Sequence, residues 1–413
     1  MKFNKWTLGL AAVGVVSLTS AARAADEAAS TATPVLTAVS STTLSGYVDT
    51  AIHWAPGSTP TTSAYAFGGF GSKDDGFNLN VVDLKLEKSL ESETEWASGY
   101  KAELWMGPNA NQIPGVMNGL GTSSSGVTFQ DFAIKQAYVA LRVPVGNGLD
   151  LKLGVFDTPV GYESLNAGDN PNYTRSWGCT IEPTEHTGLL GNYRVNESIV
   201  LTAGIANTTD QFINGRVGTA PTWGSQSLKT YMGAISLTAP DSFGFLKGAT
   251  LYGGAINGRP TGGTAPSKTW IYVGSVLPTP VEGLNLGIAW DHVAIPNTTG
   301  ISGQDTDALA GYIDFKATDK MTLHTRLDYI HLGGDGLAGG GDLITGGTAF
   351  SPGDQFLSTT FTVDYTLWKN VLSRAEFRWD HDLGPNGGNH FGGFPGGGEN
   401  DDFLLALNVI YKF

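Results

Sequence analysis

Residues 403–413 read FLLALNVIYKF, and this stretch decides the fold because its side chains change character at every second position. One set is wholly apolar and consists of Phe403, Leu405, Leu407, Val409, Tyr411 and Phe413. The set between them is mixed and consists of Leu404, Ala406, Asn408, Ile410 and Lys412. Successive side chains of a β-strand point to opposite faces, so one face of this strand can contact lipid while the other faces a wet interior.

The same two-residue period recurs along most of the sequence. In residues 361–367 (FTVDYTL) apolar and polar residues alternate strictly, and in residues 374–380 (RAEFRWD) four charges share one face. The pattern predicts an all-β fold: a transmembrane antiparallel β-barrel with about sixteen strands, an even number as single-chain bacterial barrels require. The expected starts of the strands are Thr43, Gly76, Thr94, Phe132, Leu149, Thr187, Ser198, Ser227, Gly248, Lys268, Glu282, Asp305, Met321, Asp354, Val371 and Asp401.

Short and long connections alternate between these strands. Tight connections are expected at 144–148, 318–320 and 368–370, whereas the Gly-rich stretches 56–75, 107–131, 333–353 and 383–400 are long. Barrels of bacterial outer membranes have short periplasmic turns and longer extracellular loops. A soluble β-sandwich or β-helix is the alternative fold, but neither explains these alternating lengths together with an export signal.

The first residues have the pattern of a cleavable export signal. Lys2 and Lys5 precede the apolar run 8–18 (LGLAAVGVVSL), which is too short to span a bilayer as a helix, and the triplet 22–24 (ARA) is a small-x-small cleavage site. We therefore expect a signal peptide at 1–24, a flexible periplasmic lead at 25–42 with a short helix as its alternative, and the barrel at 43–413. Such a chain is expected in the outer membrane of a Gram-negative-type cell.

Composition excludes several classes of protein. Charged residues make up 15% of the chain, well below the roughly one quarter that is usual for soluble proteins. Glycine, with 57 residues, and the aromatic residues, at 10%, are abundant. The net charge of −14, which becomes about −17 once residues 1–24 are removed, argues against nucleic acid as a partner. The single cysteine, Cys179, cannot form an internal disulfide.

One connection carries the motifs of a known family. Residues 154–163 (GVFDTPVGYE) are followed by 170–177 (NPNYTRSW), then by 182–188 (EPTEHTG) and 191–193 (GNY). This ordered set resembles the OmpL-like β-barrel porin family of exported outer-membrane proteins. The resemblance implies an outer-membrane channel. A terminal aromatic residue such as Phe413 is similar to the signal that the outer-membrane assembly machinery reads.

The long segment between these motifs has the composition of a loop that folds into a barrel. In general porins an inward loop narrows the pore, and acidic and basic side chains face each other across it, which selects small polar solutes. We expect the pore constriction to be formed by Arg175, Glu182, Glu185 and His186. The alternative is that Arg175 and Glu182 form a structural ion pair that holds the loop. The rest of the lumen wall is expected to contain Lys101, Glu103, Asp314, Arg326, Asp328, Arg374, Glu376, Arg378 and Asp380.

Motifs for catalysis are missing from the sequence. It contains no Gly-x-Ser-x-Gly elbow, no phosphate-binding loop, no His-Glu-x-x-His and no haem-binding Cys-x-x-Cys-His. The dipeptides Asp291-His292 and Asp380-His381 each place a carboxylate beside an imidazole. Neighbours on a strand face opposite ways, so neither dipeptide makes a dyad by itself. We predict a protein without enzymatic activity, cofactor or metal site.

The predicted function is that of an outer-membrane porin through which small polar solutes and ions diffuse passively. The acid excess favours a mild preference for cations. A substrate-specific channel for a sugar or an organic anion is the alternative, and an outer-membrane enzyme such as a lipase would need Ser and His to converge at the lipid-facing rim. The expected partners are outer-membrane lipid, the assembly machinery and the permeating solutes, and the resemblance to porins leaves a homotrimer open.

Overall fold

The computed structural model describes residues 41–55, 75–91, 95–113, 132–218, 227–261, 266–297, 303–333, 353–384 and 399–413. The expected signal peptide at 1–24 and nearly all of the expected lead at 25–42 lie outside the described residues, so both stay predictions. Much of the four long Gly-rich connections lies outside them as well. In the described part of the chain, no helix is long and apolar enough to cross a membrane.

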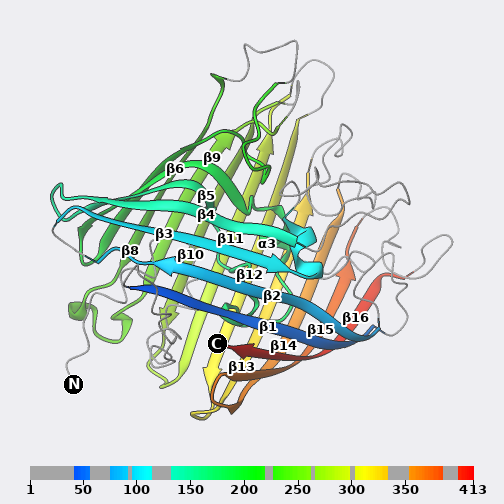
Figure 1. Ribbon diagram of the computed structural model, residues 1–413. Coiled ribbons are helices and arrows are strands. Elements are labelled where there is room, and N and C mark those ends of the chain that lie inside the picture. The colour runs from blue at the N-terminus through cyan, green and yellow to red at the C-terminus, as the bar shows by residue number, and fades with distance from the viewer. Residues whose placement is uncertain are drawn as a thin grey trace, which may run out of the picture.

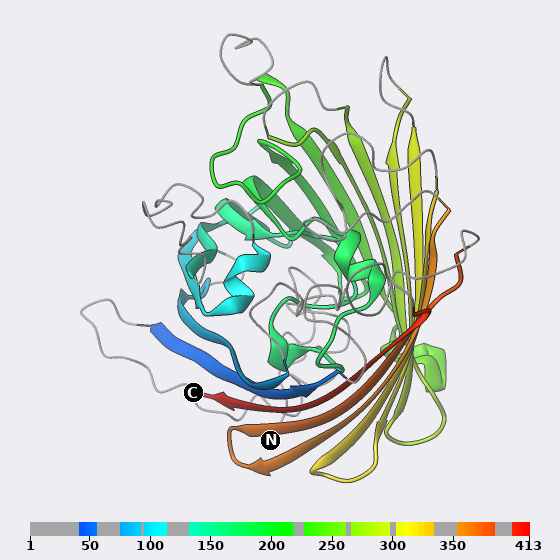
Figure 2. The ribbon, with the colours of Figure 1, turned by 90° about the vertical axis from the view of Figure 1, so that its right-hand side faces the viewer.

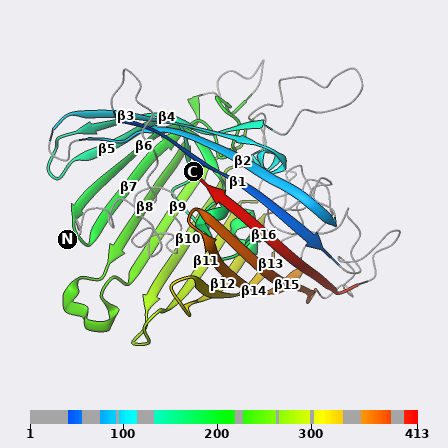
Figure 3. The same ribbon diagram turned by 60° about the horizontal axis from the view of Figure 1, so that its bottom comes forward.

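Sixteen strands in the described residues close into one antiparallel barrel, which confirms the predicted fold class. Each strand pairs with its neighbours in sequence, and β1 pairs with β16 to close the ring (Figure 1, Figure 3). Every predicted strand start lies within three residues of an observed one. The strands are β1 (Thr42–Trp54), β2 (Gly76–Lys88), β3 (Ala97–Met106), β4 (Phe132–Val143), β5 (Leu149–Asp157), β6 (Glu185–Asn196), β7 (Ile199–Ala206), β8 (Thr230–Thr238), β9 (Thr250–Gly258), β10 (Lys268–Pro278), β11 (Leu284–Ile295), β12 (Gln304–Lys316), β13 (Met321–Leu332), β14 (Gln355–Trp368), β15 (Val371–Asp382) and β16 (Asp401–Lys412).

The alternation along each strand separates an outer from an inner surface. On β16, Leu407 is 57% exposed whereas its neighbour Asn408 is 1% exposed. On β13, Leu327 is 53% exposed whereas Arg326 is fully buried. The exposed set on these strands is apolar and the buried set is largely polar, the reverse of a soluble protein. This inversion is what a barrel needs when lipid surrounds it and polar groups fill its interior.

The connections confirm the predicted asymmetry between the two ends of the barrel. Strands β14 and β15 are joined by Lys369 and Asn370 alone, and Asn370 has a φ of 69°. Tight hairpin turns require this left-handed conformation, which asparagine tolerates. At the opposite end, the connection from β5 to β6 spans residues 158–184. By the rule for outer-membrane barrels, the tight turns face the periplasm and the long connections face outward.

The seam between β1 and β16 depends on a close approach of the two backbones. The Gly46 N–H donates to the Phe413 carbonyl at 3.1 Å, and the Phe413 N–H donates to the Gly46 carbonyl at 3.0 Å. A Cβ atom at Gly46 would lie 2.0 Å from the Asp83 carbonyl oxygen, so only glycine fits. Phe413 therefore takes part in closing the ring. Its proposed role as an assembly signal is a separate prediction.

Residues 158–184, which we call the inward loop, fold into the barrel as predicted. Figure 2 shows this segment in green inside the ring of strands. It contains a 3-10 turn, η2 (Ala167–Asp169), and a short helix, α3 (Trp177–Ile181), and most of its residues are buried. A second 3-10 helix, η1 (Pro108–Gln112), also packs on β2, β3 and β4, while η4 (Asp241–Leu246) forms the turn between β8 and β9.

Candidate pore constriction

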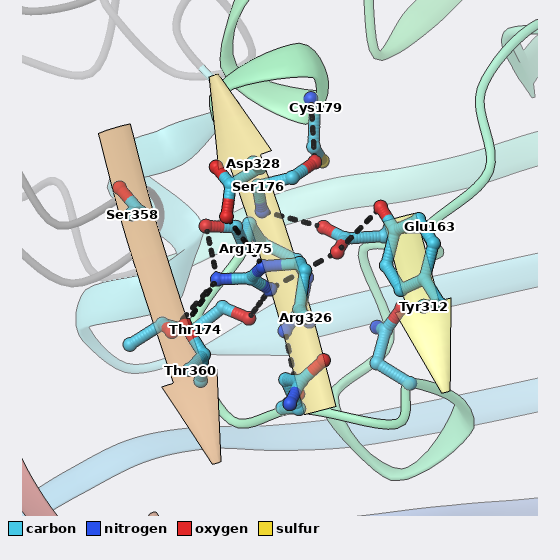
Figure 4. Close-up of polar contacts among 12 residues, drawn as sticks. Glu163, Thr174, Arg175, Ser176, Cys179, Tyr312, Arg326, Asp328, Ser358 and Thr360 are labelled. Atoms are coloured by element: carbon cyan, nitrogen blue, oxygen red, sulfur yellow. Dashed lines mark hydrogen bonds and ion pairs between the residues drawn. The ribbon is translucent and has the colours of Figure 1, made fainter. Parts of the chain in front are cut away.

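Three buried arginines of the barrel wall hold the backbone of the inward loop. We call Arg326 of β13 together with Arg374 and Arg378 of β15 the arginine clasp. Arg326 Nη1 donates to the Thr174 carbonyl at 2.8 Å, and its Nη2 donates to the Arg175 carbonyl at 3.0 Å (Figure 4). Arg378 donates to the same Arg175 carbonyl at 2.6 Å. Arg374 donates to the carbonyls of Ala167, at 2.6 Å, and Asn170. The clasp therefore satisfies loop carbonyl groups that take no part in the strand pairing of the barrel.

Acidic side chains bind the N–H groups of the same segment. Glu376 of β15 accepts from the backbone N–H of Tyr173 at 2.5 Å and of Thr174 at 2.9 Å. Asp328 of β13 accepts from the N–H of Trp177, the first residue of α3, at 2.9 Å. Within the loop, Glu163 accepts from the Ser176 N–H at 2.9 Å. Charge-assisted bonds of this kind are about twice as strong as neutral ones.

Each arginine of the clasp is paired with a carboxylate inside the barrel. Arg326 lies 2.9 Å from Asp328 and 3.1 Å from Glu163, measured between nitrogen and oxygen. Arg374 pairs with Asp364 at 2.8 Å, and Arg378 pairs with Asp380 at 2.8 Å. A buried ion is tolerable only when a partner and hydrogen bonds replace its water. Moving the loop would break the Arg326–Glu163 pair and the bonds from the clasp to the loop carbonyls, so the network fixes the loop against β13–β15.

An apolar contact fixes the other side of α3. Trp177 stacks on Phe356 of β14 with ring centroids 5.3 Å apart, and its Nε1 donates to Ser358 Oγ at 2.6 Å. Trp270 of β10 donates from its Nε1 to the Ile181 carbonyl at 2.7 Å. The buried apolar cluster continues through inward-facing side chains of β8 and β9, Met232 and Ile256. In the sequence, this apolar cluster corresponds to strands with apolar residues on both faces. That pattern did not predict an apolar core inside the barrel.

The four residues predicted at the constriction lie within or beside the inward loop, but not in one cluster. Arg175 is 3% exposed and donates to the carbonyls of Ser164 and Leu165, both at 3.0 Å, so it braces the loop from within. Glu185 is buried, with its carboxylate 3.0 Å from Lys135 Nζ. His186 is buried, with its Nε2 3.2 Å from the Thr158 hydroxyl. Their role at a constriction stays a prediction.

Glu182, the fourth of these residues, lies beside another carboxyl group. It exchanges a hydrogen bond with Asp291 of β11. Burial, and next the charge of Asp291, raise the pKa of the Glu182 carboxyl well above its usual range. A Cβ atom at Gly161, whose φ is +113°, would lie 2.3 Å from Glu182 Oε2, so the loop reaches the carboxyl only because this residue is glycine.

The predicted lumen-wall residues divide into two groups. Arg326, Asp328, Arg374, Glu376, Arg378 and Asp380 hold the inward loop, directly or through a partner. The others lie elsewhere on the inner surface: Lys101 pairs with Glu103 at 3.0 Å, and Asp314 hydrogen-bonds to His324. Lys85 lies 3.7 Å from Glu103 and extends this second group. The two-residue period places Lys85 on the polar face of β2 together with Asp83 and Glu87, although Lys85 was not among the residues predicted for the lumen wall.

Comparisons with known proteins agree with this architecture. A family model described as "Putative beta-barrel porin-2, OmpL-like" matches residues 41–413. The chain belongs to this family. Its fold and location are therefore those of an outer-membrane β-barrel porin, and porins are typically non-enzymatic channels. No curated protein matches the chain in sequence.

Solved structures with a similar fold are also porins and channels. The anion-selective porin from Comamonas acidovorans is 13% identical, with a TM-score of 0.57 over 90% of this chain and 99% of that one. The outer-membrane channel DcaP of Acinetobacter baumannii is 13% identical, with a TM-score of 0.56 over 90% and 97%. The trimer form of OmpT from Vibrio cholerae is 11% identical, with a TM-score of 0.54 over 90% and 99%. Identities this low support the fold alone.

Proposed function

We propose that this porin is a water-filled channel for the passive diffusion of small polar solutes and ions. One observation carries the proposal: inward-facing charged side chains on β2 and β3 stay in contact with solvent. Lys85 is 21% exposed and Lys101 is 14% exposed, although both point into the barrel. The inward loop is held against β13–β15. This supports a wet passage along the β2–β5 wall, beside the loop.

Charges of opposite sign face this passage from two sides. Asp169, in the η2 turn of the inward loop, is 43% exposed and lies 3.8 Å from Lys412 Nζ. It is also close enough to interact electrostatically with Lys85 of β2. An acid on the loop and lysines on the wall would create a field across the passage that orders water and favours polar solutes. We propose Asp169 as a constriction residue beside the four predicted from the sequence.

Proteoliposome swelling with a series of uncharged sugars separates diffusion from specific uptake. Passive diffusion predicts swelling rates that fall smoothly as sugar size increases, with no saturation at high concentration. A substrate-specific channel, the alternative function, would instead favour one sugar or organic anion and would be blocked by it in a saturable way. Saturable uptake of a single solute would replace the diffusion proposal by this alternative.

We propose a mild preference for cations, based on the net charge of −14. The bases that contact solvent on the inner wall are paired locally, since Lys85 and Lys101 share Glu103 and Lys85 also lies 4.0 Å from Asp83. The similarity to an anion-selective porin does not decide the sign, because selectivity depends on the residues placed in a fold rather than on the fold. A homotrimer stays a prediction, which the trimer form of a similar barrel supports.

The cation preference is expected to increase as pH rises. Burial, and next the charge of Asp291, raise the pKa of the Glu182 carboxyl well above its usual range, so this carboxyl loses its proton at a higher pH than a free glutamate and then adds a negative charge beside Asp291. Reversal potentials measured in a KCl gradient at a series of pH values test this. Glu182→Gln should remove the shift that this added charge causes. A shift that persists unchanged in this variant would exclude Glu182 as its source.

A further inference from the structure

Two strands of the barrel carry the same tripeptide, Trp-Asp-His, in the same orientation. It occupies residues 290–292 on β11 and 379–381 on β15. In both copies the central aspartate is buried inside the barrel, Asp291 at 6% exposed and Asp380 at 2%. The histidines point outward, with His292 23% and His381 30% exposed. The outer surface therefore has a repeated polar motif that the channel function does not use.

An aspartate from the next strand completes each copy. Asp307 Oδ1 of β12 accepts from Trp290 Nε1 at 3.1 Å and lies 3.0 Å from His292 Nδ1. The second copy repeats this geometry around Asp401 of β16, with 2.7 Å to Trp379 Nε1 and 2.7 Å to His381 Nδ1. The sequence could not show these dyads, because the carboxylate that faces each histidine is not its neighbour along the chain.

The hydrogen bonds fix which ring nitrogen of each histidine is left for an external ligand. The carboxylate accepts from Nδ1, which leaves Nε2 as the nitrogen turned away from it. Trp290 lies 5.8 Å from His292 between ring centroids, and Trp379 lies 5.4 Å from His381, so each imidazole is also held against an indole. When the imidazole is protonated, Nε2–H becomes a charge-assisted donor on a fixed ring.

Both copies lie near the end of the barrel that has the long connections, which is the outward-facing end. A polar row continues between them, because His331 of β13 is in register with Asp307 on one side and with Gln355 on the other. Tyr329 donates from its hydroxyl to Gln355 at 2.9 Å. We call this set the outer girdle: Trp290, His292, Asp307, Tyr329, His331, Gln355, Trp379, His381 and Asp401.

The surroundings of the outer girdle indicate which molecules contact it. Leu309 of β12 follows Asp307 by two residues on the same outer face and is 47% exposed. Phe403 of β16 follows Asp401 in the same way and is 38% exposed. The girdle therefore borders the lipid-facing apolar surface. Tryptophan and tyrosine at such a border sit at the level of lipid headgroups. In the described residues, no group of three or more His, Cys, Asp and Glu side chains could hold a metal ion. A direct metal site is therefore not the use of these histidines.

We propose that the outer girdle binds phosphate groups of the lipids that form the outer leaflet. A phosphate oxygen accepts from the protonated Nε2–H of His292 or His381, while Asp307 or Asp401 holds the ring in place and balances its charge. The acyl chains of the same lipid would lie on the apolar surface beside Leu309 or Phe403. The proposal concerns the outer surface and does not depend on which solutes cross the lumen.

The proposal predicts that lipid binding strengthens as pH falls, because the donor to the phosphate is a protonated imidazole. His292 faces Asp307, with Ile271 of β10 on its other side and His331 beyond the aspartate. His381 faces Asp401, with Leu357 of β14 on its other side. A bound phosphate adds negative charge at Nε2, so it favours the protonated imidazole.

The test is a titration of the purified, folded barrel in detergent with bisphosphorylated lipid A, followed by native mass spectrometry. The same lipid without its phosphates is the comparison ligand. His292→Gln/His381→Gln is expected to weaken binding of the phosphorylated lipid about tenfold, the value of one charge-assisted hydrogen bond. Binding of the dephosphorylated lipid should not change. Asn257→Ala is the matched control, because Asn257 is an exposed residue of β9 that hydrogen-bonds to Thr269 of β10 at the same end of the barrel and lies outside the girdle.

Three outcomes would overturn the proposal. The first is equal affinity of the double variant and the unsubstituted protein for the phosphorylated lipid. The second is equal affinity of the unsubstituted protein for both lipids. The third is that the substitutions abolish association between copies of the chain and leave lipid binding unchanged, which would make the girdle a protein contact. Where the double variant does not fold, the two single variants are titrated instead, each with a smaller expected loss.

Discussion

Replacing Arg326 with alanine is expected to release the inward loop and to increase the single-channel conductance. The variant leaves Glu163 and Asp328 buried without the guanidinium that pairs with both. Removing one partner of a buried ion pair costs about 3–5 kcal/mol. The Thr174 carbonyl loses its bond from Arg326 at the same time, and the Arg175 carbonyl keeps its bond from Arg378. The free energy of unfolding, measured by urea titration in lipid vesicles, should fall by about that amount.

The single cysteine reports directly on the position of the loop. Cys179 lies in α3, and burial, and next the charge of Glu163, raise the pKa of its thiol well above the usual range. A buried, protonated thiol reacts slowly. A maleimide reagent should therefore leave the folded, unsubstituted protein unmodified and label Arg326→Ala. Arg326→Lys, which keeps the charge but loses the planar fork, should give an intermediate result.

The matched control for this prediction is Arg142→Ala. Arg142 also pairs with a carboxylate inside the barrel, Asp150, but the pair joins β4 to β5 rather than holding the inward loop. It should leave conductance and Cys179 labelling unchanged. If Arg326→Ala also keeps the original conductance and a protected Cys179, the clasp does not hold the loop.

A lysine introduced on the outer surface at mid-height is expected to destabilise the barrel by about 2–4 kcal/mol, the cost of a base at the bilayer midplane. Leu327, near the middle of β13, is 53% exposed on the outer face. The free energy of unfolding of Leu327→Lys, measured in vesicles of defined lipid, gives this cost. Leu327→Met keeps volume and polarity and should cost less than about 1.5 kcal/mol.

The same strand provides the control that distinguishes lipid from water. Leu323 lies on the same outer face of β13 but near its periplasmic end, and it is 38% exposed. The cost of a lysine falls to about 0–1 kcal/mol near the bilayer interface, so Leu323→Lys should be nearly neutral. Equal and small costs at the two positions would mean that water, not lipid, covers this surface.

The fold was predictable because its signal is local. A strand repeats its character every two residues, so stretches such as 403–413 and 374–380 predict both a strand and the face of each side chain. The inward loop was predictable for a similar reason, since its polar and charged residues lie in one continuous segment. Both predictions needed only the order of residues along the chain.

The contacts of the candidate constriction were not predictable, because they join residues that are far apart in sequence. The guanidinium of Arg175 donates to carbonyls of its own loop, and the clasp residue Arg326 binds the Arg175 backbone from 151 positions away. Register decides such pairs, and a sequence gives the face of a strand without giving its partner's register. For the same reason, the sequence did not predict which carboxylates lie beside His292 and His381.

Recording of current across a planar bilayer tests the central claim most directly, since a barrel with lipid outside and water inside must conduct ions. Purified, folded protein added to one side is expected to produce discrete, reproducible conductance steps. The control is the same protein after heat unfolding, which should produce none. A folded, membrane-inserted protein that produces no conductance steps would contradict the account.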